Sequence, residues 1–221
     1  MDRLDALMRR RLSHDPDLKR DEREMERAAN IAASARDFGY GYAGTLPDGV
    51  PWGAPDFDAF LAPPAEKALH EEKEAVIAWV AGSGSNLLTL AGPPGVGKTH
   101  LAGAAAIALV ESGAQVIYRS EHNLLEDYRP HGNPEEAEYA YREVPWLIID
   151  DLGLEALTGW GKSIMDQLVD ARWMGAAAGL RTLITTNLLS KDLPPRVASR
   201  LGDRSRARVI QVAAGDFRRR G

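Results

Sequence analysis

The sequence predicts an α/β fold in which parallel strands form a sheet with helices on its faces. Three apolar runs favour this fold, residues 86–91, 146–151 and 181–187, and each ends in, or leads into, residues suited to bind a ligand. Helical patterns separate these runs, and a strand–helix–strand order implies a right-handed parallel crossover. Because parallel strands carry binding residues at their carboxyl edge, we expect the three ends to face a common ligand.

The first 37 residues are predicted to form two helices. Leu4, Leu7 and Met8 mark the apolar face of the first helix, and Pro16 suits the first turn of the second. The apolar stripe is thin, and a segment of this size seldom folds alone. We therefore expect residues 1–37 to bind a partner protein, with docking on the rest of the same chain as the alternative.

Residues 38–64 are rich in glycine, proline and aromatic side chains, as residues 38–42 illustrate. Glycine and proline occur too often here for a regular helix or strand. We predict a linker arm whose aromatic side chains anchor it to the next domain, with stacking on adenine or on nucleic-acid bases as the alternative. The main domain is then residues 65–221.

An amphipathic helix over residues 65–80 and a strand over residues 86–91 are predicted to open this domain. The next eight residues, Gly-Pro-Pro-Gly-Val-Gly-Lys-Thr at positions 92–99, match the phosphate-loop pattern G-x-x-x-x-G-K-[ST]. The pattern stands between a strand and a helix, which is the context that phosphate binding requires. A glycine-rich turn with an incidental lysine is the less favoured alternative.

Each residue type in this loop suits the binding of ATP or ADP. Glycines at positions 92, 95 and 97 are expected to adopt positive φ angles and to bring backbone N–H groups close to phosphate oxygens, and the start of the next helix adds more N–H groups. Lys98 is expected to lie along the β- and γ-phosphates, and the Thr99 hydroxyl to be one ligand of Mg²⁺. The expected nucleotide contacts are Gly92, Pro93, Pro94, Gly95, Val96, Gly97, Lys98, Thr99 and His100.

Further helices and a strand are predicted between this loop and the next chemical residues. The helix after the loop extends to Ser112, residues 115–118 form a strand, and residues 120–129 and 135–143 form helices on either side of a proline-containing turn. The alternation of strands and helices continues the α/β pattern.

Residues 146–151, Trp-Leu-Ile-Ile-Asp-Asp, are predicted to form an apolar strand that ends in two carboxylates. This is typical of a buried parallel strand whose carboxyl edge faces a ligand. Asp150 is placed to bind Mg²⁺ through water, and Asp151 to orient or deprotonate the water that attacks the γ-phosphate. The alternative is that the two aspartates only mark the start of a helix.

The rest of the chain predicts a helix over residues 161–173, a strand over 181–186, a short helix over 193–201 and a final strand over 209–212. Asn187 follows the first of these strands and is expected to hold the lytic water near the γ-phosphate, with capping of the next turn as the alternative. Because the sequence given ends soon after the last strand, no C-terminal lid domain is expected.

Composition argues against several other kinds of site. The chain has no cysteine, which removes disulfides and cysteine-bound zinc, and its five histidines show no metal-ligand spacing. Without a membrane-spanning apolar run or a secretory signal, we expect a cytoplasmic protein with no membrane partner. The net charge is −5, yet eight arginines accompany only two aspartates from Arg196 onward. This basic region could meet nucleic acid or nucleotide phosphates, with a solvated surface as the alternative.

Taken together, these motifs resemble the DnaC/IstB family of AAA+ ATPases. The resemblance covers roughly residues 65–218. It rests on Gly-Pro-Pro-Gly-Val-Gly-Lys-Thr-His-Leu-Ala (92–102), Leu-Ile-Ile-Asp-Asp-Leu-Gly (147–153), Thr-Thr-Asn (185–187), Ser-Arg-Leu (199–201) and Gly-Asp-Phe-Arg (215–218). The resemblance implies a P-loop AAA+ parallel sheet with flanking helices and no lid domain, preceded here by a small helical segment.

The resemblance also implies roles for individual residues. Lys98 and Thr99 correspond to Walker A, Asp150 and Asp151 to Walker B, and Asn187 to sensor 1. Arg200 corresponds to an arginine finger that completes the ATP site of a neighbouring subunit, which implies a homo-oligomer with shared sites. The competing finger is Arg204, and a further phosphate-facing arginine is Arg218. The cysteine zinc ligands found near the N-terminus of some family members are missing from this chain.

Family members load the replicative DNA helicase onto single-stranded DNA, or assist a transposase as its ATPase subunit. The resemblance therefore implies an ATP-hydrolysing helicase loader that binds the helicase through residues 1–37 and also binds single-stranded DNA. A transposase helper that binds double-stranded DNA and a nucleotide-gated adaptor with little turnover are the alternatives. A small-molecule kinase is least favoured, since no arginine-rich lid lies between the phosphate loop and Asp150.

Overall fold

A computed structural model of the chain describes residues 70–132, 134–153 and 159–213. The segments predicted at residues 1–37 and 38–64 lie outside the described residues, as do the first five positions of the helix predicted over 65–80 and the arginine at 218.

The described residues form alternating strands and helices, as the sequence predicts. The strands are β1 (Leu87–Ala91), β2 (Val116–Ser120), β3 (Trp146–Leu152), β4 (Arg181–Thr186) and β5 (Ala207–Gln211). The helices are α4 (His70–Val80), α5 (Lys98–Glu111), α6 (Glu121–Asp127), α7 (Pro134–Glu143), α8 (Gly159–Gly175) and α9 (Pro195–Leu201), with short 3₁₀ turns η3 (Ala176–Ala178) and η4 (Ser190–Asp192).

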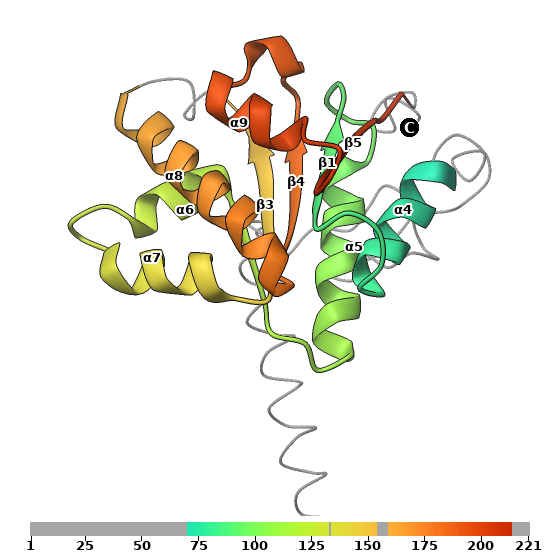
Figure 1. The fold of residues 1–221 in the computed structure, drawn as a ribbon, viewed down its shortest axis with the longest axis horizontal. Helices are drawn as coiled ribbons and strands as arrows, with labels where there is room; N and C mark the ends of the chain where they lie inside the picture. The colour runs from blue at the N-terminus through green and yellow to red at the C-terminus, as the bar shows by residue number, and fades with distance from the viewer. Residues whose placement is uncertain (1–69, 133, 154–158, 214–221) are drawn as a thin grey trace, which may run out of the picture.

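The five strands of the described residues make one sheet in the order β2-β3-β4-β1-β5, and every neighbouring pair is parallel. Helices cover both faces. Figure 1 shows α4 and α5 on one side of the strands and α6, α7 and α8 on the other. The predicted α/β fold, a parallel sheet between helical layers, is confirmed.

The central strands carry apolar side chains on both faces because successive side chains enter two different cores. In β3, Ile148 packs in the core beneath α4 and α5, whereas Leu147 and Ile149 pack in the core beneath α6, α7, α8 and α9. In β4, Leu183 and Ile184 divide between the same two cores. The apolar runs in the sequence therefore reflect burial on both faces.

Some predicted boundaries are wrong by a few residues. The last strand begins at Ala207, where the sequence predicts Val209, and it pairs with β1 so that Arg208 lies beside Leu88. Arg208 and Val209 are both exposed on this edge strand, so its burial does not follow a simple apolar pattern. Ser120 ends β2 and caps α6, because its hydroxyl accepts a hydrogen bond from the backbone N–H of Asn123 at 3.3 Å.

Two buried arginines donate hydrogen bonds to backbone carbonyls that lie just beyond helix ends. Arg172 is fully buried, and it donates to the carbonyls of Val144 at 2.6 Å and of Arg181 at 2.7 Å and to the Thr182 hydroxyl at 2.9 Å. Arg181 donates to the carbonyl of Ser83 at 2.9 Å, just beyond α4. These guanidinium groups tie the ends of helices to the beginning of β4.

The parallel register brings the carboxyl ends of three strands to one edge of the sheet. Ala91 of β1 and Leu152 of β3 both pair with Thr186 of β4, which lies between them. The phosphate loop, the two aspartates and Asn187 leave the sheet at this edge. No helix in the described part of the chain combines the length and hydrophobicity needed to cross a membrane.

Candidate nucleotide-binding site

The loop between β1 and α5 has the backbone geometry of a phosphate cradle at two of its three predicted glycines. Gly95 and Gly97 have φ angles of 83° and 94°, which side-chain-bearing residues rarely adopt. The prediction of a positive φ is wrong for Gly92. Glycine is needed here for a different reason, because a Cβ would collide with the carbonyl oxygen of Val212, the residue after β5.

Lys98 is the first residue of α5, and its ammonium group folds back into the loop. The Nζ atom donates at 2.8 Å to the carbonyls of Gly92 and Pro93 and to the Oδ1 atom of Asn187. The residue is only 6% exposed, so these oxygen atoms rather than solvent stabilise the charge. Lys98 can therefore exchange loop carbonyls for phosphate oxygens without moving far from its helix.

Asp150, near the end of β3, is a buried carboxylate surrounded by hydroxyl groups. It accepts hydrogen bonds from Thr185 at 2.5 Å and from Tyr118 at 2.7 Å, and from the Thr99 hydroxyl. Burial raises the pKa of Asp150 above its ordinary value, while these hydroxyls favour the charged form. The Thr99–Asp150 contact brings together the two residues predicted to serve Mg²⁺.

Asp151 occupies an unusual backbone conformation, with a φ of +57°. Aspartate tolerates this region better than most residues. The β3–β4 pairing shifts between Ile149 and Leu152, and the Asp151 N–H donates to the Thr185 hydroxyl at 2.8 Å. This irregularity leaves Asp151 exposed while Asp150 is buried, so the two adjacent carboxylates occupy different environments.

Asn187 connects the lysine to the second aspartate. Its Oδ1 atom accepts from Lys98 at 2.8 Å, and its Nδ2 atom donates to Asp151 Oδ1 at 2.9 Å. The sequence predicts that Asn187 faces the ligand because it follows a strand. The structure places Lys98, Thr99, Asp150, Asp151 and Asn187 in one connected set of hydrogen bonds.

The sequence analysis missed the hydroxyl groups that orient these residues. Thr185 contacts both Asp150 and Asp151, and Tyr118 reaches Asp150 from β2. The hydroxyl of Thr186 donates to the carbonyl of Leu152 at 2.6 Å and helps fix the end of β3. Threonine and tyrosine are also ordinary strand residues, so only their positions near strand ends could have marked them.

The two predicted finger arginines lie away from these contacts. Arg200 is on α9, where its guanidinium group contacts Asp170 and Trp173 of α8. Arg204 is exposed in the turn between α9 and β5. Within the described residues, the structure thus separates both arginines from the set around Lys98.

The residues fit an ATP·Mg²⁺ group. The backbone of residues 92–97 and the ammonium of Lys98 would hold phosphate oxygens, and Thr99 and Asp150 offer the oxygen atoms that Mg²⁺ prefers. When bound, the metal would neutralise charge on the phosphates. The fold and these residues define a P-loop nucleotide-binding protein of the AAA+ class.

Comparison with known proteins identifies the family. A sequence model of the IstB-like ATP-binding proteins matches residues 56–194, and the chain belongs to that family. It is 33% identical over 131 residues to an insertion-sequence ATP-binding protein of Sinorhizobium fredii, covering 58% of this chain and 43% of that protein. It is 28% identical over 137 residues to an ATP-binding protein of insertion sequence IS232 from Bacillus thuringiensis, covering 58% of this chain and 53% of the relative. The chain spans about half the length of these curated relatives.

Solved structures show the same fold. The DnaC helicase loader matches with a TM-score of 0.57 and 23% identity, over 73% of this chain and 98% of that one. The replication initiator DnaA bound to AMPPCP and single-stranded DNA matches with a TM-score of 0.60 and 20% identity, over 72% of this chain and 50% of that one. The predicted resemblance to the DnaC/IstB group is confirmed.

Proposed function

We propose that this chain hydrolyses ATP bound with Mg²⁺ at the phosphate loop. The observation that carries the proposal is the connection from Lys98 through Asn187 to Asp151, made of hydrogen bonds of 2.8 and 2.9 Å. It joins the residue suited to bind phosphate to an exposed carboxylate suited to accept a proton from water. A site for nucleotide binding alone would need the loop but not this second group.

The buried and exposed aspartates divide the work. Asp150 is held by the hydroxyls of Thr185 and Tyr118, so its oxygen atoms stay in one place to attract Mg²⁺ through water. Asp151 keeps its side chain at the solvent edge, where it orients or deprotonates the attacking water. Asn187 holds that carboxylate from the side that faces Lys98.

An arginine from a second copy of the chain completes the site in this proposal. Arg200 binds a carboxylate of its own chain, Asp170, at 2.6 Å, and this contact supports its ability to bind an anion. Arg204 is exposed in the next turn and is the competing candidate. Either guanidinium could neutralise charge that develops on the γ-phosphate.

For the cellular role, the comparisons support two candidates at different levels. Insertion-sequence proteins match at up to 33% identity, which favours an ATPase that helps a transposase on double-stranded DNA. The DnaC loader matches at 23% identity, which supports helicase loading on single-stranded DNA through likeness of fold alone. We place the insertion-sequence role first and helicase loading, through residues 1–37, second. A nucleotide-gated adaptor remains the alternative without turnover.

One exposed aromatic residue favours contact with DNA in either role. Trp160 is the second residue of α8 and is 44% exposed. The guanidinium carbon of Arg129 lies 5.3 Å from the centroid of its ring. An exposed indole beside a cation can stack on a base while the cation meets the backbone.

The test of the ATPase proposal is titration and steady-state turnover of the full chain. Lys98→Ala should lose most ATP affinity, because the variant lacks the charge that holds the phosphates, while its circular dichroism stays that of the wild type. Lys162→Ala is the matched control, since Lys162 pairs with Asp166 on α8 at 3.0 Å. Unchanged ATP affinity in Lys98→Ala would contradict the proposal that ATP binds at the phosphate loop. ATP binding without turnover, even with DNA present, would support the nucleotide-gated adaptor instead of an ATPase.

The two cellular roles separate in the same assay. Stimulation by double-stranded DNA, with none by single-stranded DNA and no association with the replicative helicase, supports the insertion-sequence role. The opposite pattern, together with loss of helicase association when residues 1–37 are removed, supports helicase loading.

A further inference from the structure

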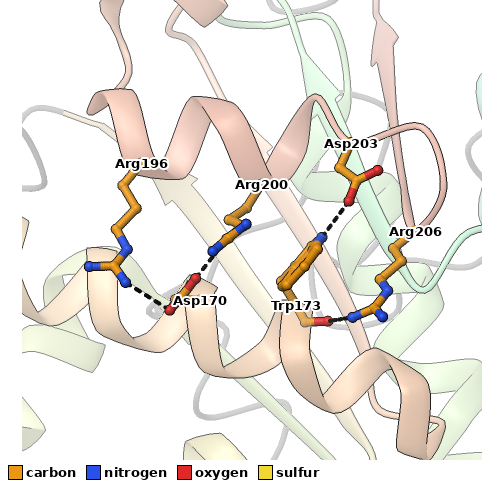
Figure 2. Close-up of polar contacts among 6 residues, drawn as sticks. All are labelled: Asp170, Trp173, Arg196, Arg200, Asp203 and Arg206. Carbon is orange, nitrogen blue, oxygen red and sulfur yellow. Dashed lines mark hydrogen bonds and ion pairs between the residues drawn. The ribbon is translucent and has the colours of Figure 1, made fainter.

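Helices α8 and α9 are joined by charged side chains that lie outside the set of hydrogen bonds around Lys98 (Figure 2). Asp170 of α8 accepts a hydrogen bond from the Nε atom of Arg200 at 2.6 Å with one carboxylate oxygen. Its other oxygen accepts from Arg196 at 3.0 Å. A single carboxylate therefore serves two arginines of α9.

The indole ring of Trp173, three residues beyond Asp170, also contacts Arg200. The guanidinium carbon of Arg200 lies 4.0 Å from the ring centroid and that of Arg206 lies 4.4 Å from it. Figure 2 shows the indole between these two groups. The Trp173 N–H donates to Asp203 at 2.9 Å, and Arg206 donates to the Trp173 carbonyl at 3.0 Å. These contacts fix the turn after α9 against α8.

Arg200 is restrained but still reachable from solvent. Its side chain is 30% exposed, compared with 17% for Asp170 and 59% for Arg196. The hydrogen bond from Arg200 is the main cause that lowers the pKa of Asp170, so this carboxylate is ionised at neutral pH. In the free subunit, the charge of Arg200 is thus already matched by an anion.

We propose that Asp170 is a positioning residue that holds Arg200 in the free subunit and releases it to a phosphate of ATP bound by a second copy of this chain. The proposal rests on the proposed ATP site and on Arg200 as its finger. The new element is the counter-ion: Arg200 must leave Asp170 of its own chain when subunits assemble.

Three features of the cluster suit such an exchange. An ion pair that solvent can still reach contributes little net stability, so a phosphate with more charge and more oxygen atoms can replace the carboxylate. Arg196 stays on Asp170, so the carboxylate keeps a partner after Arg200 leaves. The ring of Trp173 keeps the guanidinium plane oriented during the exchange, since stacking does not use the N–H groups.

The first experiment measures the contact in the nucleotide-free full chain. Phenylglyoxal modifies accessible guanidinium groups, and mass spectrometry of the peptides gives a rate for each arginine. Arg200 should react more slowly than the exposed Arg204. Asp170→Asn keeps the shape of the side chain and removes its charge, so it should raise the Arg200 rate about threefold, the scale of a surface ion pair, and leave Arg204 unchanged.

Asp166→Asn is the matched control. Asp166 lies one turn earlier on α8, its side chain is 16% exposed, and it pairs with Lys162 rather than with α9. This substitution should leave the Arg200 rate at the wild-type value.

The second experiment measures assembly by sedimentation with AMPPCP and Mg²⁺. Because Asp170→Asn has no carboxylate to give up, it should assemble at a concentration about threefold below that of the wild type, again the scale of a surface ion pair. A residue that only supported the fold would raise this concentration or lower the turnover at saturation.

The outcomes separate the exchange from the ATP site. An unchanged Arg200 rate in Asp170→Asn, or assembly at a higher concentration, overturns the exchange. If the wild type binds ATP but does not assemble, the exchange is also overturned while the ATP site stands. If titration of the wild type shows no ATP binding, the proposed function fails, and the modification rates still report whether Asp170 restrains Arg200.

Discussion

The side-chain amide of Asn187 donates to the carboxylate of Asp151 over 2.9 Å, although 36 positions separate the two residues in the chain. The contact exists because β4 lies next to β3 and both strands end at one edge of the sheet. The positive φ of Asp151 leaves the carboxylate exposed at this edge. Strand order and local backbone conformation together place the proposed base.

Asp151→Asn should retain ATP binding and lose turnover. Asparagine has nearly the same shape and leaves Asp150 for Mg²⁺, but it cannot take a proton from water. We expect hydrolysis to fall by at least ~10²-fold, within the usual range for loss of a positioned base. ATP affinity by calorimetry and phosphate release on the same sample check this. Normal turnover in the variant would make Asp151 a structural residue.

Thr185→Val should raise the Mg²⁺ requirement. Thr185 donates to Asp150 and accepts from the backbone of Asp151, and valine keeps its shape without the hydroxyl. Partners of metal-binding groups affect metal affinity by about 10-fold or more, so half-maximal turnover should need about 10-fold more Mg²⁺. Thr89→Val, at another buried strand threonine, is the control and should leave the Mg²⁺ titration unchanged.

Mixing two inactive variants should identify the finger. An Arg200→Ala subunit has an intact ATP site but gives no finger, whereas Asp151→Asn gives a finger but cannot hydrolyse ATP. In a mixed assembly, the first receives the arginine of the second, so activity should exceed that of either variant alone. Because the recovery needs assembly, turnover per subunit should rise with protein concentration.

The same mixing with Arg204→Ala is the comparison. Recovery with Arg204→Ala alone would assign the finger to Arg204, and recovery with neither would argue against a shared site. Fingers of this kind contribute about 10³- to 10⁵-fold in the best-studied GTPases, so the recovery should be easy to detect.

Trp160→Ala should weaken DNA binding if the exposed indole stacks on bases. Stacking of one base contributes about 1–3 kcal/mol, so affinity for DNA by fluorescence anisotropy should fall about 10-fold. Met174→Ala, at an exposed apolar residue near the other end of α8, is the control and should bind DNA as the wild type does. Equal affinity in both variants would leave Trp160 without a role in DNA contact.

Arg172→Met should destabilise the domain without touching the nucleotide site. The substitution leaves the buried carbonyls of Val144 and Arg181 and the Thr182 hydroxyl without their donor. We expect the free energy of unfolding in urea to fall by about 3 kcal/mol, as for other broken buried networks. Arg208→Met, at an exposed position of β5, should change it by less than about 0.5 kcal/mol.

The sequence by itself was enough to predict the candidate phosphate-, metal- and water-binding residues, because each of them stands in a recognisable local pattern. A glycine-rich turn between a strand and a helix predicts the phosphate loop, and an apolar strand that ends in Asp150 and Asp151 predicts the metal and water residues. Such patterns depend on backbone freedom and on the burial of neighbouring positions. Both properties follow from residues that are close together in the chain. The positive φ angles of Gly95 and Gly97 agree with this prediction.

Only the tertiary structure decided which distant groups meet these residues. The pairing of Tyr118 with Asp150 spans 32 positions and that of Arg200 with Asp170 spans 30. Gly92 is required by the close approach of Val212, the residue after β5, rather than by its own φ. The physical reason is that strand order and helix packing bring together parts of the chain that have no sequence relation, so hydroxyls and ion pairs that look ordinary along the chain become partners of the site only after folding.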